Sequence, residues 1–389
     1  MKPVKLIIAP DSFKGAISSL RAAEIIAEEV SAVFPECEIV KIPIADGGEG
    51  SIETILAAIG GTKHETTVIS PDDREITAAY GIASNGSAIV EMAQSSGITK
   101  QDGLHPMTAS TYGFGQLILA ALEHGAGGGE GGGGGEGRGG AMDAVLCIGG
   151  SATTDGGAGM AAALGVRFFD AEGGSFIPCG ATLGKIARID MTGIDSRVAD
   201  CKFIVMCDVE NPLYGTNGAA YIYGPQKGAT PEQVIELDAG LRHLAEVLSE
   251  SFGKEFAETP GAGAAGGLGA GCMVFLGAKL MSGIDTILKL SGFREHLAGA
   301  DLVITGEGKL DAQSFSGKVL SGIEILCNAK NVPVWSICGV CEYDKELLRS
   351  RGIVVFETSE GISIEESMSH PEKYLRSAAG KAVCELQRR

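Results

Sequence analysis

The chain has 389 residues, of which 44% are apolar and 21% charged, an ordinary globular composition at a length that favours two domains. Its formal net charge of −18 repels phosphate-rich partners, so we expect it to bind neither nucleic acid nor an anionic membrane surface. The sequence contains no run of about 18 apolar residues and no signal-peptide core, and its ten cysteines are scattered as in a reducing compartment. We therefore expect a cytoplasmic protein.

Short apolar runs alternate with segments of helical period at both ends of the chain. The pattern predicts strands over 4–9, 38–44, 301–305, 334–338 and 353–356, and helices over 20–34, 47–59, 318–330, 345–351 and 371–387. Strands that are linked by helices form parallel sheets, and such sheets bind ligands beyond the carboxyl ends of their strands. We therefore expect an α/β fold in which the two ends of the chain build one doubly wound parallel sheet.

In the middle of the chain the predicted strands and helices are spaced differently. Closely spaced strands are predicted over 66–70, 76–82 and 88–92, then a helix over 111–124, a strand over 144–148, a helix over 156–164 and a strand over 203–206. We interpret residues 66–294 as an inserted second α/β domain and residues 1–65 with 295–389 as the first domain, with a cleft between the two. Within the insert, 12 of the 16 residues over 125–140 are glycine, which predicts a flexible surface loop without site residues.

Charged, glycine-rich segments follow the first two predicted strands. Carboxylates and lysines among glycines provide charge and close backbone approach, which a phosphorylated, metal-bound ligand requires. The segments predict an enzyme site. Its candidate residues here are Asp11, Ser12, Lys14, Asp46, Gly47, Gly48 and Glu49.

The segment 147–159 reads as a strand end, a Gly/Ser/Thr loop and a helix of small residues. Backbone N–H groups and the hydroxyls of Ser151 and Thr153 could converge on an anion at the helix start. Asp155 belongs either to that site or to an ordinary N-cap. A G-x-G-x-x-A match at 157–162 lies too far beyond the strand for a dinucleotide fingerprint and lacks the acid that should follow it.

Two further candidates follow the strand over 203–206. Asp208 suits a metal or a substrate hydroxyl, and Lys227, beside Gln226, suits a phosphate as a point charge. The alternatives are a turn carboxylate and a solvated lysine.

The segment 305–313 has Glu307 and Asp311 four residues apart, and Lys318 then opens a helix. Few carboxylates with small neighbours suit Mg²⁺, which keeps several waters. No Gly-Lys pair is followed by Ser or Thr, so any nucleotide chemistry here is not that of a P-loop enzyme. The six histidines show no metal-ligand spacing, and no G-x-S-x-G elbow occurs.

Taken in order, these segments resemble the bacterial glycerate kinase family over nearly the whole chain. The matching stretches are 11–15, 45–50, 149–159, 208–215, 226–228, 264–269, 305–311 and 317–318. The resemblance implies a Rossmann-like domain with an inserted domain, the active site between the two, ATP and D-glycerate as substrates, and 2-phosphoglycerate as product rather than 3-phosphoglycerate. Together with the carboxylates of 305–313, it leads us to expect Mg²⁺ as cofactor. The chain departs from the family at Thr154, where we expect Asn, and in its longer glycine tract.

The chemistry of phosphoryl transfer suggests roles for these residues. We expect Asp46 or Asp208 to act as the base, Lys14 and Lys227 to bind phosphate or the glycerate carboxylate, and Glu307 and Asp311 to hold Mg²⁺. The helix starts at Gly47 and Gly156 would add N–H donors.

Two other functions stay open at this point. One is a nicotinamide-dependent hydroxy-acid dehydrogenase, favoured by the α/β pattern alone, and the other is a small-anion binding protein without catalysis. The sequence also leaves the oligomeric state open, with a homo-oligomer among the options.

Overall fold

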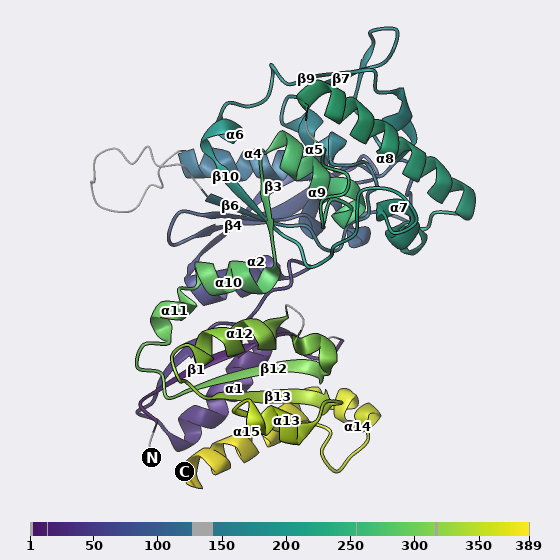
Figure 1. The fold of residues 1–389 in the computed structure, drawn as a ribbon. Helices are drawn as coiled ribbons and strands as arrows, with labels where there is room; N and C mark the ends of the chain where they lie inside the picture. Colours follow the sequence, from purple (N-terminus) through teal and green to yellow (C-terminus); the bar gives the residue numbers. More distant parts are fainter. Residues whose placement is uncertain (1–2, 14, 127–142, 254, 316–317, 389) are drawn as a thin grey trace. The chain divides into compact units, whose positions relative to one another are not determined.

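The structure is a computed structural model that describes residues 3–13, 15–126, 143–253, 255–315 and 318–388 (Figure 1). Its contacts divide the chain into two compact units. Unit 1 comprises Met1–Asp46, Ala57–Gly60 and Ser282–Arg389, and unit 2 comprises Gly47–Leu56 and Gly61–Met281. The domain limits expected near residues 65 and 295 stay a prediction.

Unit 1 contains a five-stranded sheet with the strand order β14-β13-β12-β1-β2, and every neighbouring pair is parallel. In chain order this is 2-1-3-4-5, which is a doubly wound order. The strands are β1 (Lys5–Pro10), β2 (Glu38–Lys41), β12 (Leu302–Leu310), β13 (Val334–Cys341) and β14 (Ile353–Glu357). The prediction that the two ends of the chain build one parallel sheet is therefore confirmed.

Helices cover both faces of this sheet (Figure 1). The helices of unit 1 are α1 (Ser19–Val33), α10 (Gly283–Leu290), α11 (Phe293–His296), α12 (Val319–Asn328), α13 (Lys345–Ser350), α14 (Ile364–Ser369) and α15 (Pro371–Arg388), with a 3₁₀ turn η4 (Ala312–Phe315). On one face, apolar side chains of α1 and α15 pack against Leu6, Ile8 and the buried Trp335. Alternate strand residues point to each face, so the sheet is buried on both sides, as its near-continuous apolar strands require.

Unit 2 contains a mixed six-stranded sheet with the order β11-β10-β6-β5-β4-β3. Its strands are β3 (Gly61–Ile69), β4 (Glu75–Ala83), β5 (Ala88–Glu91), β6 (Asp143–Cys147), β10 (Lys202–Met206) and β11 (Lys279–Met281). The pairs from β11 to β5 are parallel, and β5-β4-β3 is an antiparallel meander. A small antiparallel sheet, β8-β7-β9, comprises Ser175–Phe176, Arg167–Phe169 and Arg188–Asp190.

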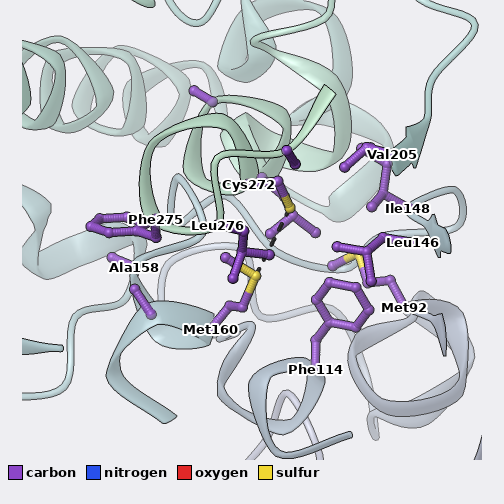
Figure 2. Packing of buried hydrophobic residues seen from close by; sticks show 14 of the residues in the cluster. Met92, Phe114, Leu146, Ile148, Ala158, Met160, Val205, Cys272, Phe275 and Leu276 are labelled. Carbon is purple, nitrogen blue, oxygen red and sulfur yellow. Dashed lines mark hydrogen bonds between the residues drawn. The ribbon is translucent and has the colours of Figure 1, made fainter. Parts of the chain in front are cut away.

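The helices of unit 2 are the part of α2 (Ser51–Ile59) that ends at Leu56, α3 (Ala93–Ser96), α4 (Tyr112–Ala126), α5 (Ala158–Ala163), α6 (Arg197–Asp200), α7 (Ala219–Tyr223), α8 (Pro231–Phe252) and α9 (Ala264–Phe275). Three 3₁₀ turns complete it, η1 (Ile98–Lys100), η2 (Gly180–Lys185) and η3 (Pro225–Lys227). Figure 2 shows the core, where Phe114 of α4, Leu146 of β6, Met160 of α5 and Cys272 of α9 point toward one another. This packing holds the carboxyl ends of β5, β6 and β10 in place.

Three details differ from the sequence-based expectation. The helix expected from residue 47 begins at Ser51, because the left-handed φ angles of 80° at Gly47 and 85° at Gly50 interrupt a right-handed helix. The strand expected to end at residue 305 runs to Leu310, so Glu307 lies within β12. The small sheet and β11 were not predicted, because strands of two or three residues are too short to show a period. Helix α8 was not predicted either, although its buried residues follow a helical period.

Three other expectations have simpler outcomes. Residues 127–142, which include most of the glycine tract, lie outside the described part of the chain. All ten cysteines are free thiols. Among the described helices, none has the length and apolar character that a membrane span needs.

Candidate functional site

In unit 1 the candidate residues gather where the strand order reverses, between β1 and β12. Pro10 of β1 pairs with Gly306 of β12, and the N–H of Asp11 donates to the carbonyl of Gly306 at 2.7 Å. The Asp11 carboxylate accepts from the N–H of Ser12 at 2.6 Å. Ligands of doubly wound sheets bind at such a switch point. The structure therefore places Asp11, Ser12 and Glu307 at the edge where this fold binds ligands.

The Glu307 carboxyl group is largely buried, and it lies among other charges. Burial raises the pKa of Glu307 to about 7, and the negative charges of Asp11 and Asp311 act in the same direction. A hydrogen bond from Ser314 and the positive charge of Lys318 oppose the shift. Three carboxyl groups and one lysine, from the end of β1 and from the segment 307–318, therefore interact electrostatically.

Ser314 connects the two predicted metal ligands. Its hydroxyl donates to Glu307 at 2.8 Å and accepts from the N–H of Asp311 at 3.2 Å. Lys318 donates to the side chain of Gln313 at 3.1 Å, and the N–H of Gln313 donates to Asp311 at 2.8 Å. The sequence analysis missed Ser314, although its place three residues after Asp311 is a signal for a local side-chain bond.

The two predicted carboxylate ligands at this edge of the sheet are suited to Mg²⁺ and are too few for a metal site formed by protein ligands alone. No group of three or more His, Cys, Asp or Glu side chains with metal-binding geometry occurs in the described ranges. Mg²⁺ commonly uses only one or two carboxylates and completes its shell with water and phosphate oxygens. Glu307 and Asp311, joined through Ser314, offer such a pair, and a divalent cation would offset their mutual repulsion.

In unit 2 two glycine-rich loops touch each other. The N–H of Gly149, after β6, donates to the carbonyl of Gly47 at 2.8 Å. A Cβ atom on Gly149 would lie 2.7 Å from the Cα of Gly48, and one on Gly47 would lie 3.1 Å from the Cβ of Met206 in β10. The glycines are therefore needed for close approach of three segments at the carboxyl edge of the sheet.

Lys227 is buried instead of reaching into solvent. Its ammonium group donates to the hydroxyl of Ser151 at 3.2 Å and to the carbonyl of Thr153 at 2.6 Å. Burial lowers the pKa of Lys227 to about 7, against the opposing effect of the Asp155 charge. The solvated-lysine alternative is thus wrong, and the structure brings Lys227, Ser151 and Thr153 together.

The loop that carries Ser151 and Thr153 also packs on an unusual turn. Ala265, Gly266 and Gly267 have consecutive left-handed conformations at the start of α9, and Ala265 is not a glycine. Left-handed runs are costly for residues with a Cβ atom. The Ser151 hydroxyl contacts the carbonyl of Ala265 at 3.3 Å, so this strained turn supports the loop. In the sequence, the only indication of this turn is the cluster of glycines around Ala265.

Asp155 is fully buried, and its carboxylate binds backbone N–H groups at the start of α5. Its carboxylate accepts from the N–H and hydroxyl of Thr111 at 2.7 and 2.8 Å, and from the N–H groups of Gly157 and Gly159 at 3.2 and 3.3 Å. Burial raises the pKa of Asp155, and these hydrogen bonds oppose the shift. The helix start expected to offer N–H donors to a ligand therefore already has an internal acceptor. Thr154, next to it, has a buried hydroxyl without a hydrogen-bond partner in the described structure.

The remaining candidates are exposed. They are Asp46, Glu49, Asp208, Gln226 and Lys318. Asp208 follows the end of β10, as expected from the sequence, and Asp46 directly precedes Gly47 in the chain. Lys14 lies outside the described residues.

These loops and their order along the chain can be compared with known proteins. A profile of the glycerate kinase family matches residues 6–387. The chain belongs to the glycerate kinase family. The resemblance inferred from the motifs is confirmed, and the chain is an enzyme of the kinase class.

Relatives of this glycerate kinase family member cover nearly its whole length. Glycerate kinase from Halalkalibacterium halodurans is 41% identical over 379 residues, which are 96% of each chain. Glycerate 2-kinase from Escherichia coli is 40% identical over 353 residues, which are 90% of this chain and 89% of the other. A crystal structure of a candidate glycerate kinase 2 from Salmonella typhimurium has a TM-score of 0.82 at 34% identity, covering 99% of this chain and 98% of that one. The expected fold class is thereby confirmed.

Proposed function

We propose that the protein transfers the γ-phosphoryl group of ATP to the 2-hydroxyl of D-glycerate, giving 2-phosphoglycerate and ADP. The observation that carries the proposal is the match to the glycerate kinase family over residues 6–387. The relative from Escherichia coli, a glycerate 2-kinase, supports the 2-position over the 3-position. The doubly wound sheet with charged residues at its switch point suits a phosphorylated ligand. A cytoplasmic location agrees with the free state of all ten cysteines.

In unit 1, Glu307 and Asp311 would hold Mg²⁺, and Asp11, Ser12, Lys14 and Lys318 would surround the phosphates. Bound Mg²⁺ supplies the charge neutralisation that phosphoryl transfer needs. The protein's own contribution is orientation: Ser314 fixes Glu307 relative to Asp311, and a positively charged Lys318 offsets part of the negative charge of the edge. Without a P-loop motif, positioning of the phosphates depends on these loops.

Asp46, the residue of unit 1 that directly precedes Gly47, or Asp208 of unit 2 would accept the proton of the attacking hydroxyl, since both are exposed carboxyl groups. Glu49 and Gln226, also exposed, are the candidate contacts to substrate. The hydroxyls of Ser151 and Thr153 are buried and lie 3.2 Å from each other, so they would act by holding the loop that carries them. Lys227 would act on the substrate through the loop, because its ammonium group is bonded to Ser151 and Thr153 inside the protein.

Asp155 would likewise hold the loop in place rather than touch the ligand. Its carboxylate is enclosed by five donors of α5 and of the segment that precedes α4, and a buried negative charge would repel a phosphate that came close.

A coupled assay tests the proposal. The protein is mixed with D-glycerate, ATP and Mg²⁺, with enolase and pyruvate kinase added so that only 2-phosphoglycerate yields pyruvate. Pyruvate without any mutase would establish the kinase and the 2-position together. ADP formation with pyruvate only after addition of phosphoglycerate mutase would show a 3-kinase, and absence of ADP would refute the kinase proposal.

A further inference from the structure

Glu91, the last residue of β5, is a carboxylate inside unit 2 that no sequence motif pointed to. Its side chain is 0% exposed, and no ion pair with a cation is found for it in the described part of the chain. Glu324, which is also buried, is bonded to the guanidinium of Arg351 at 2.6 and 2.8 Å. An unpaired buried carboxylate is costly, so its retention needs compensation from hydrogen bonds.

That compensation comes from the turn that follows the Asp46-Gly47-Gly48 motif. One carboxylate oxygen of Glu91 accepts from the N–H of Gly50 at 3.2 Å and from the side-chain amide of Gln94 at 3.3 Å. The other oxygen accepts from the N–H of Ile52 at 3.2 Å. Glu91 therefore caps the nine-residue helix α2 from another part of the chain, where a negative charge also complements the helix dipole.

The same residue is connected to the second glycine loop. Glu91 pairs with Cys147 in the parallel β5–β6 ladder, and the N–H of the next residue, Met92, donates to the carbonyl of Cys147 at 2.8 Å. Two residues after Cys147, the N–H of Gly149 donates to the carbonyl of Gly47. Glu91 thus lies at the point where the turn before α2 and the loop after β6 are joined.

We propose that Glu91 is a positioning residue for phosphoryl transfer, whose carboxylate fixes the turn over 47–51 that carries the candidate substrate contacts Gly47, Gly48 and Glu49. This inference rests on the proposed function of that turn. It also revises the expectation that the helix start would donate N–H groups to a ligand, because Glu91 occupies those of Gly50 and Ile52. The substrate would instead contact the residues of the turn that precede Gly50, which are Gly47, Gly48 and Glu49.

The test uses Glu91→Gln, Glu91→Asp and, as a control, Glu53→Gln. The Gln variant keeps the size but places an amide N–H against a backbone N–H, whereas the Asp variant keeps the charge on a shorter side chain. Glu53 lies in the first turn of the same helix but is partly exposed and forms a surface ion pair with Lys63. We expect Glu91→Gln to lower kcat for D-glycerate about tenfold or more, Glu91→Asp to recover part of the loss, and Glu53→Gln to stay within about twofold of the unmodified protein.

Hydrogen exchange of the peptide over 47–56 gives a readout that does not depend on activity. We expect its amides to exchange about tenfold faster in Glu91→Gln, with the core strands β6 and β10 unchanged. Unchanged exchange and kinetics in both Glu91 variants would overturn the inference; if the Gln variant does not fold, the Asp variant decides. An unmodified protein that lacks glycerate kinase activity would instead refute the proposed function, and the exchange data would still decide whether Glu91 holds the turn.

Discussion

The amide of Gly149 donates a hydrogen bond to the carbonyl oxygen of Gly47, with 2.8 Å between nitrogen and oxygen. This contact joins loops that lie about a hundred residues apart in the sequence, and it leaves no room for a side chain on Gly149. The geometry of the candidate site in unit 2 therefore depends on backbone packing as much as on its charged side chains.

Replacement of Gly149 by alanine should separate the two loops. The new Cβ atom would lie 2.7 Å from the Cα of Gly48, a backbone atom that cannot rotate away. We expect a loss of about 2 kcal/mol in the free energy of unfolding and a fall in kcat/KM of roughly tenfold or more. Gly184→Ala is the matched control, since no atom lies within 4 Å of its Cβ position. Equal behaviour of the two variants in urea unfolding and in the assay would contradict the packing argument.

Lys227 should make stability depend on pH. Its pKa is about 7 in the folded protein, against an ordinary value of 10.5. Below about pH 7 Lys227 is protonated in both the folded and the unfolded protein. Between about pH 7 and 10.5 it is protonated only in the unfolded protein, so the free energy of unfolding rises with pH across this window.

Urea unfolding at pH 6.5 and 9 measures this effect. Relative to Lys227→Met, the unmodified protein should gain about 2 kcal/mol between the two pH values. Lys185→Met removes an exposed lysine of the same unit and should follow the unmodified protein. Parallel pH curves for the unmodified protein and Lys227→Met would mean that burial does not shift this pKa.

One of two exposed carboxyl groups should be the base. If Asp46 or Asp208 takes the proton of the hydroxyl, its replacement by asparagine should lower kcat by about 10²–10⁴-fold without lowering the thermal midpoint. Asp200→Asn, an exposed residue of α6, serves as the control. Full activity in both site variants would remove them from the chemistry.

Glu307 should control the requirement for Mg²⁺. With one of two carboxylate ligands replaced in Glu307→Gln, half-maximal activity should need at least about tenfold more Mg²⁺ at fixed ATP. The surface variant Glu360→Gln, which loses an exposed ion pair with Lys381, should leave the Mg²⁺ titration unchanged. A Glu307→Gln enzyme with an unaltered titration would place the metal elsewhere.

Thr154 offers a stability test of the departure from the family pattern. Its buried hydroxyl has no partner in the described structure, so Thr154→Val should raise the free energy of unfolding by about 1 kcal/mol and leave kcat/KM within about twofold. The same change at Thr111, whose hydroxyl bonds Asp155 and the N–H of Met160, should instead destabilise the protein. Loss of activity in Thr154→Val alone would indicate that the hydroxyl meets a ligand.

Local pattern was sufficient for much of the fold. The alternation of apolar runs and helical periods predicted β1, α1, β13 and α15 close to their observed limits, because strand and helix periods are properties of neighbouring residues. It also indicated the doubly wound sheet and, through the loop motifs, the family. Where glycines interrupt the pattern, as at Gly47 and Gly50, the predicted helix started too early.

For the candidate site, too, some features could be predicted from the sequence and others could not. The sequence by itself determined which loops carry charge, because glycines, carboxylates and lysines beyond strand ends are visible without coordinates. Only the tertiary structure decided which contacts those groups make. Lys227 is buried and donates to Ser151, and Asp155 accepts from N–H groups at the start of α5. Glu91 accepts from the N–H of Gly50, about 40 residues before it in the chain. Burial and hydrogen-bond partners depend on how distant segments pack, and sequence spacing contains no distance between them.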